Sequence, residues 1–292
     1  MQGRIVKIIT RRYIVESGGK FYNASSRGKL RNKNIKPIVG DIVDLDIDPE
    51  DENFAYICKV HKRNNFLKRP ETANVSMVIV TFAVRSPNPD FKLLNSLLVA
   101  CEIRGITPLI CFNKSDIDKD RKFINDIIKI YSNLPYKIVF TGFENRDTIK
   151  DLVENLSLGV NVIAGPSGVG KSTIINKIIP NANMETSGIS KKLMRGKHTT
   201  RHSELFRVKE GVFLCDTPGF TNYTLDDIDI LDFKNYMPDI NEFSYDCKFS
   251  DCIHIFEPKC SVLNAVKENK ISVERYEFYK SSIIYIKEKS KY

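Results

Sequence analysis

The chain of 292 residues is 42% hydrophobic and 28% charged, a balance that excludes extensive disorder and indicates two or three folded domains. No apolar run reaches the roughly 18 residues of a membrane span, and the N-terminus lacks the apolar core of a signal peptide. We therefore expect a cytoplasmic protein that does not associate with membranes.

The net charge of +9 is concentrated at the N-terminus. Residues 1–40 contain ten Lys and Arg against the single acid Glu16, whereas residues 41–52 carry seven acids and no base. A basic block on a folded module favours an anionic polymer such as RNA as the partner, although a solvated face would have the same composition.

Residues 1–67 form the first predicted domain. Short alternating segments, separated by turns such as Gly-Gly at residues 18–19, predict the five strands of a small antiparallel β-barrel. An OB-fold with a basic, RNA-binding face fits this pattern, and an SH3-like barrel would give nearly the same one.

Residues 68–223 form the second predicted domain. Apolar strands such as 75–82 and 107–112 alternate with helical segments such as 91–105, which is typical of a doubly wound, mainly parallel α/β sheet. Residues 224–292 are helical in character and form the third predicted domain.

The segment GPSGVGKST follows an apolar strand and precedes a helical segment, as a phosphate-binding loop requires. Its glycines allow backbone N–H groups to surround phosphates at the positive end of a helix. Lys171 is expected to pair with β- and γ-phosphate oxygens, and Ser172 to hold Mg²⁺. The predicted contacts are Gly165, Pro166, Ser167, Gly168, Val169, Gly170, Lys171, Ser172 and Thr173.

The segment VFLCDTPG supplies the companion of this loop. An apolar strand ends at Asp216, which can hold a metal-bound water, and Gly219 can donate its backbone N–H to the γ-phosphate. DTPG alone is a common turn, but together with a phosphate loop it indicates a nucleoside triphosphatase.

The NKSD motif predicts which base is bound. Asp116 can accept hydrogen bonds from both N–H donors of guanine, a pair that adenine does not offer. Asn113 would brace the loop, and Lys114 would lie along the plane of the base. The alternative is that such a motif after a strand is an ordinary helix N-cap. The predicted base-reading residues are Asn113, Lys114, Ser115 and Asp116.

The order of these motifs is unusual. NKSD precedes the phosphate loop and DTPG, whereas ordinary GTPases have NKxD last. Each motif lies on its own strand–loop unit, so the site survives if the old termini are joined and the chain is opened after DTPG. The sequence therefore predicts a circularly permuted GTPase domain.

The cysteines divide into two groups. Cys58, Cys101, Cys111 and Cys215 lie in apolar runs and are expected to be core thiols. The second group lies within CKFSDCIHIFEPKC and combines three thiols with an imidazole, the donor set of a closed, structural zinc site holding one ion per chain. Its predicted ligands are Cys247, Cys252, His254 and Cys260.

With the motif RGKHTTRH at 195–202, these features resemble the RsgA/YjeQ family of circularly permuted GTPases. The resemblance covers essentially the whole chain. It implies an N-terminal OB-fold, a permuted GTPase domain and a C-terminal zinc domain. It also implies a role in late maturation of the small ribosomal subunit, with the protein bound to rRNA and released when the subunit stimulates GTP hydrolysis.

The same resemblance assigns roles around the first switch. Thr200 would reach Mg²⁺ in the GTP state, and His198 would act in hydrolysis; otherwise His198 belongs to a basic RNA-facing loop. The family's Ser-Ala base-supporting loop is replaced here by Thr141 and Gly142.

We expect a monomer that binds GTP and GDP. Two other functions remain open: a nucleotide-gated RNA-binding module with incidental turnover, and a translation factor acting on whole ribosomes.

Overall fold

A computed structural model describes residues 1–10, 12–27, 36–68, 71–142, 144, 147–180, 204–216 and 228–289, with the side chain of Asp216 also outside the description. The chain divides into two compact units, Met1–Ile79 with Ile149–Phe220 and Val80–Thr148 with Thr221–Tyr292. The three-domain division with boundaries at 67 and 223 stays a prediction. Of the helices that the structure describes, none has the length and apolar character of a membrane span.

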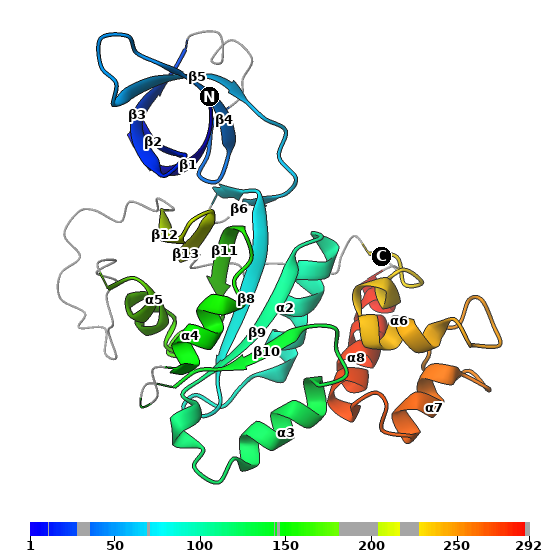
Figure 1. Ribbon diagram of the computed structural model, residues 1–292. Helices are drawn as coiled ribbons and strands as arrows, with labels where there is room; N and C mark the ends of the chain where they lie inside the picture. Colours follow the sequence, from blue (N-terminus) through cyan, green and yellow to red (C-terminus); the bar gives the residue numbers. More distant parts are fainter. Residues whose placement is uncertain are drawn as a thin grey trace. The chain divides into compact units, whose positions relative to one another are not determined.

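The first unit begins with a closed five-stranded barrel, which Figure 1 shows in blue. Its strand order is β1-β2-β3-β5-β4, with β1 closing on β4, the Greek-key order of an OB-fold. One detail differs from the prediction, since β3 and β5 pair in parallel. The strands are β1 (Gln2–Ile9), β2 (Arg12–Ser17), β3 (Lys20–Ser26), β4 (Ile42–Ile47) and β5 (Phe54–Val60).

Alternation along the strands fills the barrel. Ile5, Val15, Val43 and Ile57 are fully buried in its core. Cys58 follows Ile57 on β5, so its side chain points to the opposite face and is exposed. The prediction that Cys58 is a core thiol was therefore wrong; Cys101, Cys111 and Cys215 are buried as expected.

The second sheet has the strand order β10-β9-β8-β11-β13-β12. In the first unit, β11 and β13 are parallel and β12 is antiparallel to β13. In the second unit, β9 and β10 are parallel. The bounds are β8 (Val75–Ala83), β9 (Thr107–Asn113), β10 (Lys137–Phe140), β11 (Gly159–Ala164), β12 (Leu205–Lys209) and β13 (Val212–Asp216), and a small hairpin precedes them, β6 (Phe66–Lys68) and β7 (Glu71–Ala73).

The helix Phe91–Ile103 matches the expected helical segment 91–105, and helices beyond residue 224 match the helical character expected there. Helical rather than strand periodicity places them correctly, although two short 3₁₀ turns were not expected. The helices are α2 (Phe91–Ile103), α3 (Lys122–Tyr131), α4 (Asp147–Glu154), α5 (Lys171–Ile178), α6 (Pro238–Ser244), α7 (Ser261–Lys267) and α8 (Val273–Lys289), and the 3₁₀ turns are η1 (Ser115–Ile117) and η3 (Phe233–Tyr236).

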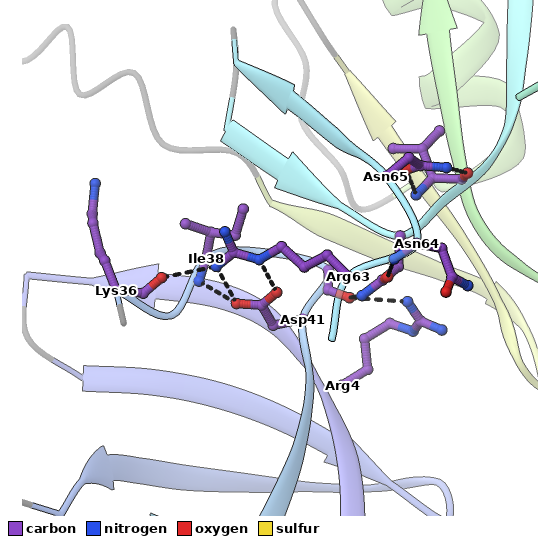
Figure 2. Close-up of polar contacts among 10 residues, drawn as sticks. Arg4, Lys36, Ile38, Asp41, Arg63, Asn64 and Asn65 are labelled. Carbon is purple, nitrogen blue, oxygen red and sulfur yellow. Dashed lines mark hydrogen bonds and ion pairs between the residues drawn. The ribbon is translucent and has the colours of Figure 1, made fainter. Parts of the chain in front are cut away.

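An ion pair between buried Asp41 and partly exposed Arg63 ties the barrel to the segment that follows it (Figure 2). Asp41 is fully buried, and both of its carboxylate oxygens accept hydrogen bonds from Arg63, at 2.7 and 2.9 Å. The backbone N–H of Ile38 donates to the same carboxylate at 2.8 Å. Through these hydrogen bonds to Asp41, the turn before β4 and the chain after β5 are held together.

Gly40 completes this junction. Its backbone has φ +90°, and a Cβ there would lie 2.1 Å from the carbonyl oxygen of Ala73. Its own carbonyl oxygen accepts hydrogen bonds from Arg4 and Asn74, both at 3.1 Å. Asn65 exchanges two hydrogen bonds with the backbone of Val75, the first residue of β8. The barrel is thus joined to β8 by a hydrogen-bonded network.

The barrel also contacts the β12–β13 hairpin within the first unit. Lys7 forms an isolated β-bridge and a 2.8 Å ion pair with Glu204. The guanidinium of Arg4 lies 5.8 Å from the centre of the Phe213 ring, and burial lowers its pKa although Glu16 acts to raise it. Arg4 and Lys7 of the basic N-terminal block thus already contact other residues of the protein.

We predict that Asp41→Asn lowers the free energy of unfolding by about 2–3 kcal/mol, since Arg63 loses its buried charged partner. Asp46→Asn is the control, because Asp46 pairs with Arg27 on the surface and such pairs contribute at most about 1 kcal/mol. Urea unfolding followed by circular dichroism measures both. If both variants lost the same free energy of unfolding, the Asp41–Arg63 pair would have no special role in stability.

Candidate functional site

The phosphate loop lies between β11 and α5 in the first unit. Gly165, Gly168 and Gly170 have φ values of 147°, 80° and 96°, which side chains other than glycine rarely adopt. These conformations turn the backbone into the first turn of α5, the end of a helix at which backbone N–H groups can bind anions. The ammonium of Lys171 donates to the carbonyl oxygens of Gly165 and Pro166 at 3.0 and 2.8 Å, so its charge is held across the loop.

The register of the sheet brings the DTPG strand to this loop. Strand β13 runs parallel to β11, and Asp216 pairs with Ile163, two residues before the phosphate loop begins. The two motifs that the sequence separates by more than forty residues are therefore adjacent. Thr217, Pro218, Gly219 and Phe220 lie outside the described residues, as do His198 and Thr200.

The NKSD motif follows β9 in the second unit. Asn113 is fully buried, and its side-chain oxygen accepts a 2.9 Å hydrogen bond from the hydroxyl of Thr141. Lys114 has φ 59°, and its ammonium donates to the carbonyl oxygen of Ser86. The left-handed turn at Lys114 redirects the chain, so that Asp116 follows on a short 3₁₀ turn.

A different acid supports the helix that follows NKSD. The N–H of Ile124, in the first turn of α3, donates to Asp118 at 2.8 Å. The acid that supports this helix thus lies two residues beyond the motif.

Thr141 and Gly142, at the place where the base-supporting loop is expected, lie beside the NKSD motif. The N–H of Ser115 donates to the carbonyl oxygen of Thr141 at 3.0 Å, which fixes the loop against NKSD. A Cβ on Gly142 would lie 2.6 Å from a carboxylate oxygen of Asp116. A pocket of about 400 Å³ lies beside these residues and includes Asp116, Gly142 and Thr148 in its lining. The Thr141–Asn113 contact was not predicted, because it joins residues that are distant along the chain.

The four predicted zinc ligands come together in the second unit. One donor atom from each of the four lies within 4.8 Å of all the others. Nδ1 of His254 is 3.4 Å from the sulfur of Cys247 and 3.5 Å from that of Cys260, and these sulfurs are 3.8 Å apart. Tetrahedral ligands at the Zn–S distance of about 2.3 Å would be about 3.8 Å apart, so the donor set fits zinc.

Burial shifts the pKa values of two residues of this cluster. It raises the pKa of Cys252 to about 12 and lowers the pKa of His254 to about 4. Neutral imidazole is the form that ligates metal, and a divalent cation would stabilise the thiolates that burial disfavours. Nδ1 is the nitrogen of His254 that faces the sulfurs. In the described part of the chain, Nε2 of His254 is buried without a hydrogen-bond partner.

Glu257 holds the loop that carries these ligands. Its carboxylate accepts hydrogen bonds from the N–H groups of Ile253, Ile255 and Phe256 at 2.8, 2.8 and 2.9 Å. Burial acts to raise the pKa of Glu257, but these hydrogen bonds together lower it. The role of Glu257 was not predicted, since a single acid between two ligands has no distinctive pattern.

Known proteins match this chain over nearly its whole length. A family model described as RsgA GTPase matches residues 60–226, and one described as RsgA N-terminal domain matches residues 2–57. The small ribosomal subunit biogenesis GTPase RsgA of Clostridium novyi is 41% identical over 279 residues, covering 96% of this chain and 95% of the relative. The protein of that name from Alkaliphilus metalliredigens is 36% identical over 291 residues, covering 100% and 99%.

Solved structures agree with these relatives. YloQ, described as a circularly permuted GTPase, has a TM-score of 0.81 at 30% identity, covering 98% of this chain and 95% of its own. YjeQ from Thermotoga maritima has a TM-score of 0.81 at 31% identity, with 98% of both chains covered. The fold and motif order thus define a circularly permuted GTPase. The chain belongs to the RsgA GTPase family.

We predict that Thr141→Val lowers the affinity for GTP up to about tenfold, because the side chain of Asn113 loses its hydroxyl donor. Thr141→Ser keeps the donor and is expected to bind normally. Titration with a fluorescent GTP analogue measures both. Normal binding by the valine variant would show that Asn113 needs no support from this loop.

For the metal cluster, we predict that Cys252→Ala loses bound zinc and that α6–α8 become easier to unfold. GTP binding is expected to persist, since none of the predicted GTP contacts is a zinc ligand or lies in α6–α8. Cys58→Ala is the matched control, because that thiol is exposed. Elemental analysis and nucleotide titration test both variants, and a full zinc content in Cys252→Ala would remove Cys252 from the ligand set.

Proposed function

We propose that this chain acts in late maturation of the small ribosomal subunit, binding rRNA and leaving the subunit when GTP is hydrolysed. The observation that carries the proposal is the near full-length similarity to relatives named small ribosomal subunit biogenesis GTPase. The protein would work as a cytoplasmic monomer, with the barrel, the permuted GTPase domain and the zinc domain as its functional parts.

Each motif has a defined role in the proposed reaction. Asp116 reads the donor edge of guanine, Asn113 and Thr141 hold that loop, and Lys171 pairs with phosphate oxygens. Ser172, Thr200 and Asp216 would hold Mg²⁺, which neutralises charge on the phosphates when bound. One zinc per chain would stabilise the fold around Cys247, Cys252, His254 and Cys260.

Hydrolysis is expected to depend on the partner. In Ras-like enzymes a Gln after DTPG orients the attacking water, whereas here Phe220 follows Gly219 and cannot do so. Unassisted turnover would then be slow, on the order of 10⁻⁴–10⁻² s⁻¹. We infer that the docked subunit orders the first switch, and that His198 there orients water or offsets developing charge.

The barrel is the proposed rRNA-binding module. Arg4 and Lys7 are engaged with the hairpin, and Arg27 and Lys36 form ion pairs with Asp46 and Glu71. Arg12 and Lys20 remain exposed on the strands. Phosphate contacts are therefore expected from such exposed positions rather than from the whole basic block.

Single-turnover GTP hydrolysis with and without small ribosomal subunits tests the proposal. We predict strong stimulation by small subunits, and we predict that His198→Ala keeps GTP and subunit binding but loses most of the stimulated rate. Asp116→Asn serves as the control that cannot bind GTP.

Absence of stimulation in the wild-type protein would favour a nucleotide-gated RNA-binding module. Stimulation only by whole ribosomes would favour a translation factor. Near-normal stimulation of His198→Ala would assign the catalytic group to another residue or to the ribosome.

A further inference from the structure

Phe256 is the most exposed large apolar side chain among the described residues. It lies in the segment that joins α6 to α7 and carries the four metal ligands; we name residues 245–260 the knuckle (Figure 1). Phe256 is 86% exposed, and two other aromatic rings of the knuckle, Tyr245 and Phe249, are 78% and 40% exposed. Such a concentration of exposed rings in one short segment indicates a contact surface.

The backbone beneath Phe256 is fixed. Its N–H donates to Glu257, and the neighbouring His254 and Ile255 are 0% and 8% exposed. The hydroxyl of Tyr276 on α8 also donates to the carbonyl oxygen of His254 at 3.0 Å. The ring is thus presented on a rigid turn, so a partner can bury it with little loss of backbone entropy.

The charge of the knuckle argues against RNA. Asp246, Asp251 and Glu257 outnumber Lys248 and Lys259, and three thiolates with one zinc would add a further negative charge. Asp246 and Asp251 are exposed, and among the described residues their carboxylates have no hydrogen-bond or ion-pair partner. A polyanion would be repelled here, whereas residues 1–40 would attract it.

The same groups suit a cationic polypeptide. Exposed carboxylates pair with Lys and Arg, and aromatic faces bind ammonium and guanidinium groups. One ring of the knuckle already contacts a cation, since the ammonium of Lys248 lies 5.3 Å from the centre of the Phe249 ring. The exposed rings and acids of this short segment therefore suit a Lys/Arg-rich protein surface.

We propose that the knuckle docks on a basic protein segment of the small ribosomal subunit, with Phe256 as its anchor. This inference rests on the proposed function, and it divides recognition between two modules. The barrel would bind rRNA, and the knuckle would bind protein.

The test compares the zinc-loaded full chain with Phe256→Ala, using two probes in the presence of a GTP analogue. The probes are intact small subunits and protein-free rRNA from the same subunits. Phe256→Ala is expected to bind intact subunits about tenfold more weakly, as for an interface anchor, and rRNA as well as the wild type does. Phe256→Tyr keeps the ring and is expected to restore subunit binding.

Reversing charges on the knuckle tests whether its partner is positively or negatively charged. Asp246→Lys combined with Asp251→Lys weakens subunit binding if the partner is basic, and strengthens it if the partner is RNA. Both residues are exposed and are not metal ligands, so the variant is expected to fold and to retain zinc.

Three outcomes would overturn the inference. Phe256→Ala could weaken binding to rRNA and to subunits equally, which would show that the ring stacks on bases. The charge reversal could strengthen subunit binding. Both variants could also bind subunits as the wild type does. Failure of the wild-type protein itself to bind small subunits would instead reject the proposed function, and the inference with it.

Discussion

The placement of each nucleotide-binding motif at the carboxyl end of a parallel strand is the constraint on which this protein depends. NKSD follows β9, the phosphate loop follows β11, and Asp216 ends β13. The geometry of such a loop is set by its own strand and the neighbouring one, as the pairing of Asp216 with Ile163 shows. Because these units are local, the chain can be opened and rejoined elsewhere without changing them. A permuted motif order is therefore compatible with an intact GTPase domain.

Long-range polar contacts then hold the pieces together. In the first unit Asp41 and Arg63 join the barrel to the following segment. In the second unit Arg275 of α8 donates to both carboxylate oxygens of buried Asp239 at 2.8 and 2.7 Å, and to Asn95 of α2 at 3.1 Å. Burying charged groups costs free energy unless each of them is paired. These ion pairs therefore favour one packing of the helices and strands more than they add to stability. They attach the C-terminal helices to α2 through defined geometry.

The sequence predicted the local features of the fold and of the candidate site. Periodicity located the barrel strands and the helices. Spacing predicted four metal ligands, and the structure brings their donor atoms within 4.8 Å of one another. The sequence missed Thr141 as the partner of Asn113, and it could not pair Asp41 with Arg63 or Asp239 with Arg275. It also placed Cys58 in the core, since an apolar run does not show which alternate residues face inward. These misses have one physical origin, because each depends on the register or packing of elements that are distant in the sequence.

Charge distribution is the remaining level of organisation. The net charge of +9 suggests that polyanions could bind over the whole surface, yet individual charged side chains have different partners. The guanidinium of Arg4 contacts the ring of Phe213. Asp44 on β4 is hydrogen-bonded to His61, and this hydrogen bond is the main cause of its lowered pKa. The exposed acids of the knuckle remain available for other contacts. The net charge of the whole chain thus describes its long-range attraction to polyanions, whereas each specific contact depends on which charges the fold leaves exposed.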